Sequence, residues 1–292
     1  MKIKLEKNKD ITSYLTLKTK VRAEYFFEAK TREDLIMAKK TSIEQKLPLL
    51  ILAGGSNFAI TKDVISGLVV KNSYSELELV QENKNEVLLL VSSGYPVSKL
   101  VNETIEKGWS GFAYHKGLPG TVGGAIYNNS KWTKPLSSFG DNLIEAWLVD
   151  KAGKVKKVNR DYFQFAYDFS ILQKTKEILL EAIFRLNKSD PKELKKQSQE
   201  AFAYRRQTQP QGVFSSGCFF QNVSGKSAGE MIDKAGLKGH RVGNFQVSKK
   251  HANFIINMGD GKGEDLKKLI EIIKDRVRDK FGVELKEEVN II

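Results

Sequence analysis

Short continuous runs of apolar residues recur along the chain and predict buried β-strands. The clearest runs are 49–52 and 87–91, which are rich in leucine and valine and too short for helices of ordinary length. Further strands are expected near 67–70, 144–149, 155–158 and 178–184. We expect the strands at 49–52 and 87–91 to be buried.

Helix-start signals separate these strands. Thr31 is placed to cap a helix that runs to Lys46, with Asp34 in the reciprocal position of a capping box. Pro96 stands where a second helix would start, and Gly108 where it would stop. The first half of the chain therefore contains at least two helices between its strands.

The last hundred residues are dominated by helical patterns. Asp190-Pro191 predicts a cap followed by proline at the first helical position, and a short helix is expected over 227–235 before Gly236. A final helix is expected over 264–281 and is ended by Gly282. Its apolar residues recur on one face and predict a core contact: Leu266, Leu269, Ile270, Ile273 and Val277.

Strands and helices that do not alternate regularly indicate an α+β fold. With 292 residues, the chain exceeds the usual size of one core, so we expect two or three domains. The pattern suggests divisions at 1–72, 73–188 and 189–292.

Composition favours a soluble globular protein, with 40% hydrophobic and 28% charged residues. A single cysteine excludes an intrachain disulfide, and the first residues carry no apolar signal segment, so we expect a cytoplasmic protein. No apolar run is long enough to span a bilayer. The net charge of +13 favours anionic partners, although a solvated lysine-rich surface explains it equally well. Basic residues are not interleaved with aromatic ones, so nucleic acid is not expected as a partner.

Two glycine clusters are candidates for a cofactor site. Gly54-Gly55-Ser56-Asn57 follows a predicted strand, and successive backbone N–H groups in such a turn can form an anion-binding nest. The spacing is not that of a Rossmann fingerprint, and a plain turn is the alternative. The second cluster, residues 117–125, holds four glycines and a proline. Together the two clusters suit a flat cofactor lying against the backbone.

The only cysteine lies in the segment Gly217-Cys218-Phe219-Phe220-Gln221-Asn222. A thiol at such a turn is either a core residue or a proton donor. The histidines His115, His240 and His251 share no ligand spacing and there is no second cysteine, so we expect no metal site.

These three segments together resemble those of the UDP-N-acetylenolpyruvoylglucosamine reductases, the MurB-type reductases, and the resemblance runs from about residue 15 to 289. It implies an FAD-binding fold of the vanillyl-alcohol-oxidase type in two subdomains, 1–72 and 73–188. An α+β substrate-binding domain would follow over 189–292, with its C-terminal tail returning to the active site. The short stretch between Asn222 and Lys238 is similar to the subtype without an extra tyrosine loop.

The resemblance also implies a reaction. Hydride passes from NADPH through FAD to the enolpyruvyl ether of a UDP-linked sugar, and a hydroxyl or thiol then donates a proton. Cys218 takes the donor's position and Glu288 that of a glutamate that assists. A thiol has a reference pKa of about 8.5, so it is a credible substitute for a serine. We expect no membrane partner and a monomer.

The site residues follow from the matched motifs. The expected FAD contacts are Gly54, Gly55, Ser56, Asn57, Gly117, Pro119, Gly120, Thr121, Gly123, Gly124 and Ala125. The expected substrate contacts are Tyr167, Ser170, Arg205, Arg206, Asn222, Lys238 and His251.

The sequence departs from the family in three places. Residues 16–21 lack a paired glycine, and 127–132 replace a stretch of small residues. Asp168 stands where the family has an arginine that contacts the substrate. A carboxylate there would repel an enolate, so we predict that Asp168 pairs with a basic residue, Arg205 or Arg206, which supplies the missing charge. The alternatives are a flavoprotein of the same fold with another substrate and a weakened nucleotide-binding homologue.

Overall fold

A computed structural model describes residues 3–292, and the chain forms two compact units built from interleaved segments. Unit 1 contains residues 3–6, 25–54 and 67–205. Unit 2 contains residues 7–24, 55–66 and 206–292. The three consecutive regions suggested by the sequence are therefore not the compact units, and their assignment as subdomains remains a prediction.

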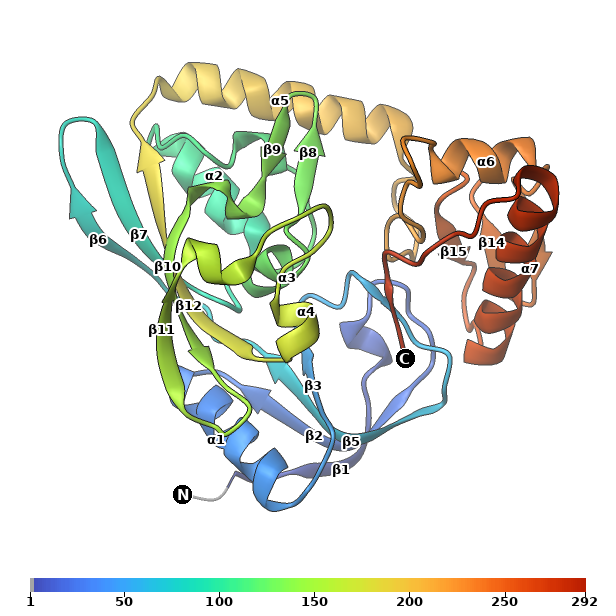
Figure 1. The fold of residues 1–292 in the computed structure, drawn as a ribbon, viewed down its shortest axis with the longest axis horizontal. Helices are drawn as coiled ribbons and strands as arrows, with labels where there is room; N and C mark the ends of the chain where they lie inside the picture. Colours follow the sequence, from blue (N-terminus) through green and yellow to red (C-terminus); the bar gives the residue numbers. More distant parts are fainter. Residues whose placement is uncertain (1–2) are drawn as a thin grey trace. The chain divides into compact units, whose positions relative to one another are not determined.

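The largest sheet lies in unit 1 and has the strand order β11-β10-β12-β7-β6 (Figure 1). All its pairings are antiparallel, and register shifts interrupt the pairing of β10 with β12 and of β6 with β7. The strands are β6 (Leu77–Glu82), β7 (Glu86–Ser92), β10 (Leu143–Val149), β11 (Val155–Asn159) and β12 (Ile178–Asn187). β12 is buried over nearly its whole length because it lies in the middle of the sheet.

One core of unit 1 lies against this sheet. Helices α2 (Val97–Glu106) and α3 (Val122–Tyr127) contribute apolar residues that pack with those of β7 and β12. Phe112, Phe139 and Phe184 lie within ring-contact distance of one another in this core. The remaining elements are η2 (Ala113–His115), β8 (Lys131–Thr133), β9 (Leu136–Ser138), η3 (Phe139–Asn142), η4 (Arg160–Phe163), α4 (Leu172–Thr175) and α5 (Pro191–Thr208), whose last three residues belong to unit 2.

A second core of unit 1 surrounds helix α1 (Arg32–Glu44). Thr31 and Asp34 form the predicted capping box at its N-terminus. Leu35 and Ala38 are fully buried against apolar residues of strand β5 and of the ends of β10 and β12. A second sheet has the order β1-β2-β5-β3, and its strands are β1 (Glu6–Asp10), β2 (Arg22–Ala29), β3 (Leu49–Leu52) and β5 (Val64–Asn72).

Unit 2 is built around two helices and a small sheet. Helices α6 (Ala228–Lys234) and α7 (Gly263–Phe281) share a core with β14 (Phe245–Val247) and β15 (Ile255–Asn257). β13 (Arg241–Val242) completes this sheet. The short helix η1 (Thr12–Tyr14) also belongs to unit 2. The C-terminal strand β16 (Asn290–Ile291) pairs in parallel with β4 (Phe58–Ala59), so the tail lies beside the segment that follows the first glycine cluster.

The helices and strands expected from the sequence are confirmed with small shifts of their ends. All five predicted apolar residues of α7 are buried, and Gly282 adopts the left-handed conformation (φ 65°) that ends the helix. Mixed helix and strand content confirms the α+β class. Within residues 3–292, no helix combines the length and the apolar character needed to cross a membrane.

Candidate functional site

The second glycine cluster is held in unit 1 by the loop that joins β7 to α2. The N–H groups of Val122 and Gly123 donate to the carbonyl oxygens of Tyr95 and Ser93, at 2.9 and 2.8 Å. Gly54 lies against this cluster, because a Cβ at position 54 would overlap the Cα of Gly120. The two predicted cofactor segments thus meet at Gly54 and Gly120, and the contact itself requires the glycine.

Two further glycines are required by the protein's own backbone. Gly55, in unit 2, has φ 66°, and a Cβ there would overlap the carbonyl oxygen of Tyr14. A Cβ on Gly123 would lie 2.9 Å from Ser93. Cofactor approach is therefore not the only reason for glycine at these positions, and a substitution at either would disturb the fold whether or not a cofactor binds.

Gly124 differs from these glycines and provides a test of whether the cluster suits a cofactor. A Cβ at Gly124 would meet Ala53 at 3.7 Å, an ordinary van der Waals distance, and its φ is not positive. The protein itself thus leaves room for a side chain. Nearby, the Thr121 hydroxyl is buried without a hydrogen-bond partner among the described residues. Unfilled space and an unsatisfied hydroxyl in one segment fit a bound group such as FAD.

We expect Gly124→Ala to weaken FAD binding without weakening the fold. Alanine is favoured over glycine inside a helix by roughly 0.5–1 kcal/mol, so the flavin-free protein should be at least as stable as the parent. The measurements are the FAD content of the purified protein and the thermal unfolding of the flavin-free form. Unchanged FAD affinity would show that Gly124 does not face the cofactor.

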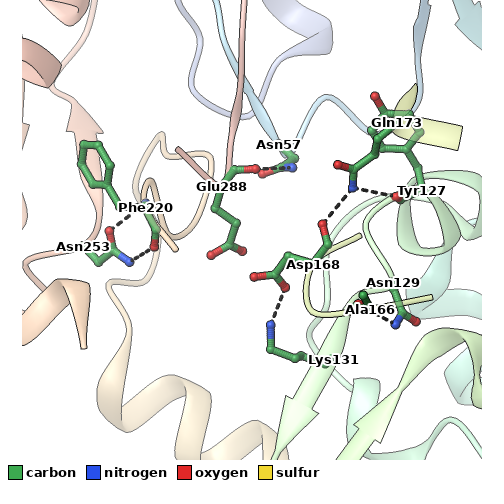
Figure 2. Close-up of polar contacts among 10 residues, drawn as sticks. All are labelled: Asn57, Tyr127, Asn129, Lys131, Ala166, Asp168, Gln173, Phe220, Asn253 and Glu288. Atoms are coloured by element: carbon green, nitrogen blue, oxygen red, sulfur yellow. Dashed lines mark hydrogen bonds and ion pairs between the residues drawn. The ribbon is translucent and has the colours of Figure 1, made fainter. Parts of the chain in front are cut away.

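Cys218 lies in a turn of unit 2 that is fixed by Asn253. Gly217, with φ 82°, opens the turn, and Cys218 is partly exposed. The N–H of Phe219 donates to the Asn253 carbonyl at 2.8 Å. The Asn253 side chain accepts from the N–H of Phe220 at 3.0 Å and donates to its carbonyl at 2.8 Å (Figure 2). We did not identify Asn253 from the sequence, because an asparagine in a loop has many roles there.

Glu288 reaches the same turn through its backbone. Its N–H donates to the carbonyl of Phe219, the residue that follows Cys218, at 2.8 Å. Its carbonyl accepts from Nδ2 of Asn57 at 3.3 Å (Figure 2). Asn57 also accepts the N–H of Asn290 at 2.9 Å. Unit 2 thus brings together three predicted site residues, Asn57, Cys218 and Glu288, that lie far apart in the sequence.

Asp168 pairs with a residue that we did not predict. Its carboxylate forms an ion pair with Nζ of Lys131, and both side chains are largely buried (Figure 2). The expectation of a basic partner is therefore confirmed, but the partner that the structure gives is Lys131 and not Arg205 or Arg206. The contact could not be predicted from the sequence, because the two residues are 37 positions apart and Lys131 lies in a segment without a regular pattern.

The other substrate residues predicted in unit 1 lie near this ion pair or near the second glycine cluster. Tyr167 is half exposed, and Lys131 Nζ lies 3.4 Å from the centre of its ring. Ser170 is fully buried, and its hydroxyl donates to the carbonyl of Tyr127 at 2.8 Å, so this hydroxyl already has a structural partner. The guanidinium of Arg205 lies 4.8 Å from the Trp132 ring.

His115, just before the second glycine cluster, is fully buried, and neither ring nitrogen has a hydrogen-bond partner among the described residues. Burial, and to a smaller extent the charge of Arg205, lowers the pKa of His115 to about 3. This histidine is therefore neutral near pH 7.

The substrate residues predicted in unit 2 already have partners within it. The carbonyl of Arg206 accepts from Nζ of Lys250 at 2.7 Å, and the Asn222 side chain accepts the N–H of Ala228 at 3.0 Å. Lys238 forms an exposed ion pair with Asp233 at 2.5 Å.

His251 is half buried, and its Nδ1 accepts the N–H of Asn253 at 3.3 Å. Burial, with a smaller contribution from the charge of Lys238, lowers its pKa. His251 therefore favours the neutral form. Its hydrogen bond to the N–H of Asn253 supports the loop that fixes the Cys218 turn.

Comparisons with known proteins cover almost the whole chain. Residues 23–159 match the family model of an FAD binding domain, and residues 209–292 match that of the C-terminal domain of UDP-N-acetylenolpyruvoylglucosamine reductase. The reductase of that name from Protochlamydia amoebophila is 36% identical and covers 92% of this chain and 88% of its own. The one from Listeria innocua is 34% identical, over 99% and 95%. The crystal structure of the reductase from Thermus caldophilus superposes with a TM-score of 0.83 at 26% identity, over 99% of this chain and 98% of that one.

Proposed function

Since the chain belongs to the UDP-N-acetylenolpyruvoylglucosamine reductase family, we infer that it reduces this UDP-sugar to UDP-N-acetylmuramate in peptidoglycan precursor synthesis. It is an FAD-dependent oxidoreductase, and the family's use of NADPH gives the hydride source. The observation that carries this conclusion is the match of both an FAD binding domain and the family's own C-terminal domain in one chain.

FAD would be held by the two glycine clusters, in the space that Gly124 leaves open and within reach of the Thr121 hydroxyl. When bound and reduced by NADPH, FAD supplies the hydride that saturates the enolpyruvyl double bond. We propose the other predicted residues of the clusters as its remaining contacts. The predicted subdomain division belongs to this proposal.

Cys218 would donate the proton that completes the reduction. The turn that Gly217 opens presents a partly exposed thiol, and Asn253 fixes the backbone that follows it. The backbone N–H of Glu288 bonds to Phe219, the residue that follows the proposed donor Cys218, so the two predicted catalytic residues lie at the same turn. A positioned general acid typically contributes 10²–10⁴-fold to a rate, so the loss of this thiol should be readily measurable.

The remaining substrate contacts are proposed from chemistry. A guanidinium fork suits a diphosphate or a carboxylate, which assigns Arg205 and Arg206 to the anionic parts of the UDP-sugar. Asn222, Lys238 and His251 are proposed to contact the same ligand, and the net charge of +13 attracts it. Tyr167 is proposed to contact the enolpyruvyl group, whereas Ser170 would have to give up its bond to Tyr127 to do so.

Two assays test the proposed function. Denaturing the purified protein should release FAD into solution, and NADPH oxidation should depend on UDP-N-acetylenolpyruvoylglucosamine. Release of FMN, or NADPH oxidation that ignores this substrate, would contradict the proposal. The alternatives were motivated by Asp168 at the position of the family's arginine, and the ion pair with Lys131 gives this carboxylate a basic partner.

We also propose a cytoplasmic monomer. A single cysteine suits a reducing compartment, and the substrate is a nucleotide-linked precursor. Size-exclusion chromatography with light scattering should give one species of about 32.9 kDa. A stable dimer would contradict the monomer.

A further inference from the structure

Two of the segments that differ from the motifs of the family that this sequence resembles meet in unit 1. One is the segment 127–132, and the other is Asp168. Lys131 of the first forms an ion pair with Asp168 of the second (Figure 2). Each of these two segments supplies one charge of the same ion pair, so we interpret Lys131 and Asp168 as one coupled change in the sequence.

Hydrogen bonds hold these two segments in register. The Nε2 of Gln173 donates to the carbonyls of Tyr127 and Asp168, at 3.0 and 2.8 Å, and Nδ2 of Asn129 donates to the carbonyl of Ala166 at 3.1 Å (Figure 2). Ala166 and Phe169 bond to each other across the turn that contains Asp168. Asp168 itself has φ 49°, a conformation that few residues other than glycine adopt. The turn is therefore fixed, and so is the direction of the carboxylate.

The ammonium group of Lys131 is fixed in position but keeps hydrogen-bond donors that no described contact occupies. Its side chain is 17% exposed, and Nζ lies between the Asp168 carboxylate and the face of the Tyr167 ring. An ammonium group has three donors, and the carboxylate contact through Asp168 Oδ1 takes one of them. Donor capacity thus remains beside Tyr167, the residue proposed to contact the enolpyruvyl group.

We propose that Lys131 is a catalytic residue of this chain, and that it supplies the positive charge which stabilises the enolate of the substrate in place of the family's arginine. Asp168 is its positioning residue. This inference rests on the proposed function, because the enolate arises only in that reaction. Charge that develops in a transition state is stabilised best by a donor already fixed in place, and Asp168 and Tyr167 fix this one.

A purely structural ion pair is the competing explanation, and it predicts something different. A pair that only closes the turn would support the cofactor and the substrate alike, so its loss would affect both half-reactions. A cation that acts on the enolate affects only the half-reaction with the enolpyruvyl substrate. The two half-reactions, followed separately by stopped flow through the flavin absorbance, distinguish these roles.

The test compares Lys131→Met with the parent and with Lys134→Met. Lys134 is a matched control, because it lies on the same hairpin, is exposed and also faces an aromatic ring, that of Tyr204. We expect Lys131→Met to slow flavin reoxidation by UDP-N-acetylenolpyruvoylglucosamine by about a hundred- to a thousand-fold, the typical loss for one oxyanion donor. Flavin reduction by NADPH should stay within about twofold of the parent, as should both steps in Lys134→Met.

A rescue variant keeps the proposal testable if Lys131→Met disturbs the turn. Adding Asp168→Arg to Lys131→Met returns a cation to the family's position, and we expect it to recover at least about tenfold of the lost rate. Reoxidation at the parent's rate in Lys131→Met, or equal slowing of both half-reactions with no rescue, would overturn the proposal. A parent that is not reoxidised by this substrate at all would instead contradict the proposed function.

Discussion

Replacing Cys218 with alanine is expected to slow the half-reaction with UDP-N-acetylenolpyruvoylglucosamine by about 10²–10⁴-fold, the usual contribution of a general acid. Flavin reduction by NADPH should remain at the parent's rate, because no proton from Cys218 is needed in that step. Stopped-flow measurement of each half-reaction gives both rates on the same protein.

Cys218→Ser is the matched control for this prediction. A hydroxyl can donate the same proton from the same turn, so the serine variant should retain substantial activity. Equal slowing of both half-reactions in Cys218→Ala would identify a structural cysteine and remove it from the mechanism.

Replacing Asn253 with alanine should lower both the stability of the protein and its rate. Asn253 is 4% exposed, and its side chain satisfies both the N–H and the carbonyl of Phe220. Unsatisfied buried groups cost about 1–3 kcal/mol each, so the loss of both partners should lower the free energy of unfolding by roughly 2–6 kcal/mol. The turn that carries Cys218 should loosen, and displacement of about 1 Å can lower a rate by about a hundredfold.

Asn244→Ala provides the comparison for Asn253→Ala. The Asn244 side chain accepts a hydrogen bond from the exposed Arg241 in the same unit, so its loss should change the unfolding free energy by less than about 0.5 kcal/mol. Urea unfolding monitored by circular dichroism measures both variants. An Asn253→Ala protein as stable as Asn244→Ala would contradict the role given to this side chain.

Local signals in the sequence predicted the longer helices and most strands of the largest sheet, but not β2 or β6. Thr31, Pro96 and Gly282 each act through the few residues around them, so caps and stops could be assigned from the sequence alone. The short strands β8, β9 and β13 to β16 could not be predicted, because two or three residues carry no periodicity. Segments 7–24 and 55–66 belong to unit 2 although their neighbours in sequence belong to unit 1. This division depends on long-range packing, which leaves no local signal in the sequence.

The motifs of the site were predictable, but the contacts that hold its residues were not. Cys218 and Glu288 were matched separately, and only the fold brings both to the backbone of Phe219. The reason for glycine at positions 54 and 55 was only partly predicted, because the neighbouring backbone of Gly120 and Tyr14 cannot be inferred from a glycine pair. Lys131 was missed because its partner is 37 residues away and its segment departs from the family.

The central claim is tested most directly by one anaerobic experiment. The parent protein is reduced with one equivalent of NADPH and then mixed with UDP-N-acetylenolpyruvoylglucosamine. We predict that the flavin is reoxidised as UDP-N-acetylmuramate appears, one product for each flavin. A flavin that stays reduced in the presence of excess substrate would contradict the account.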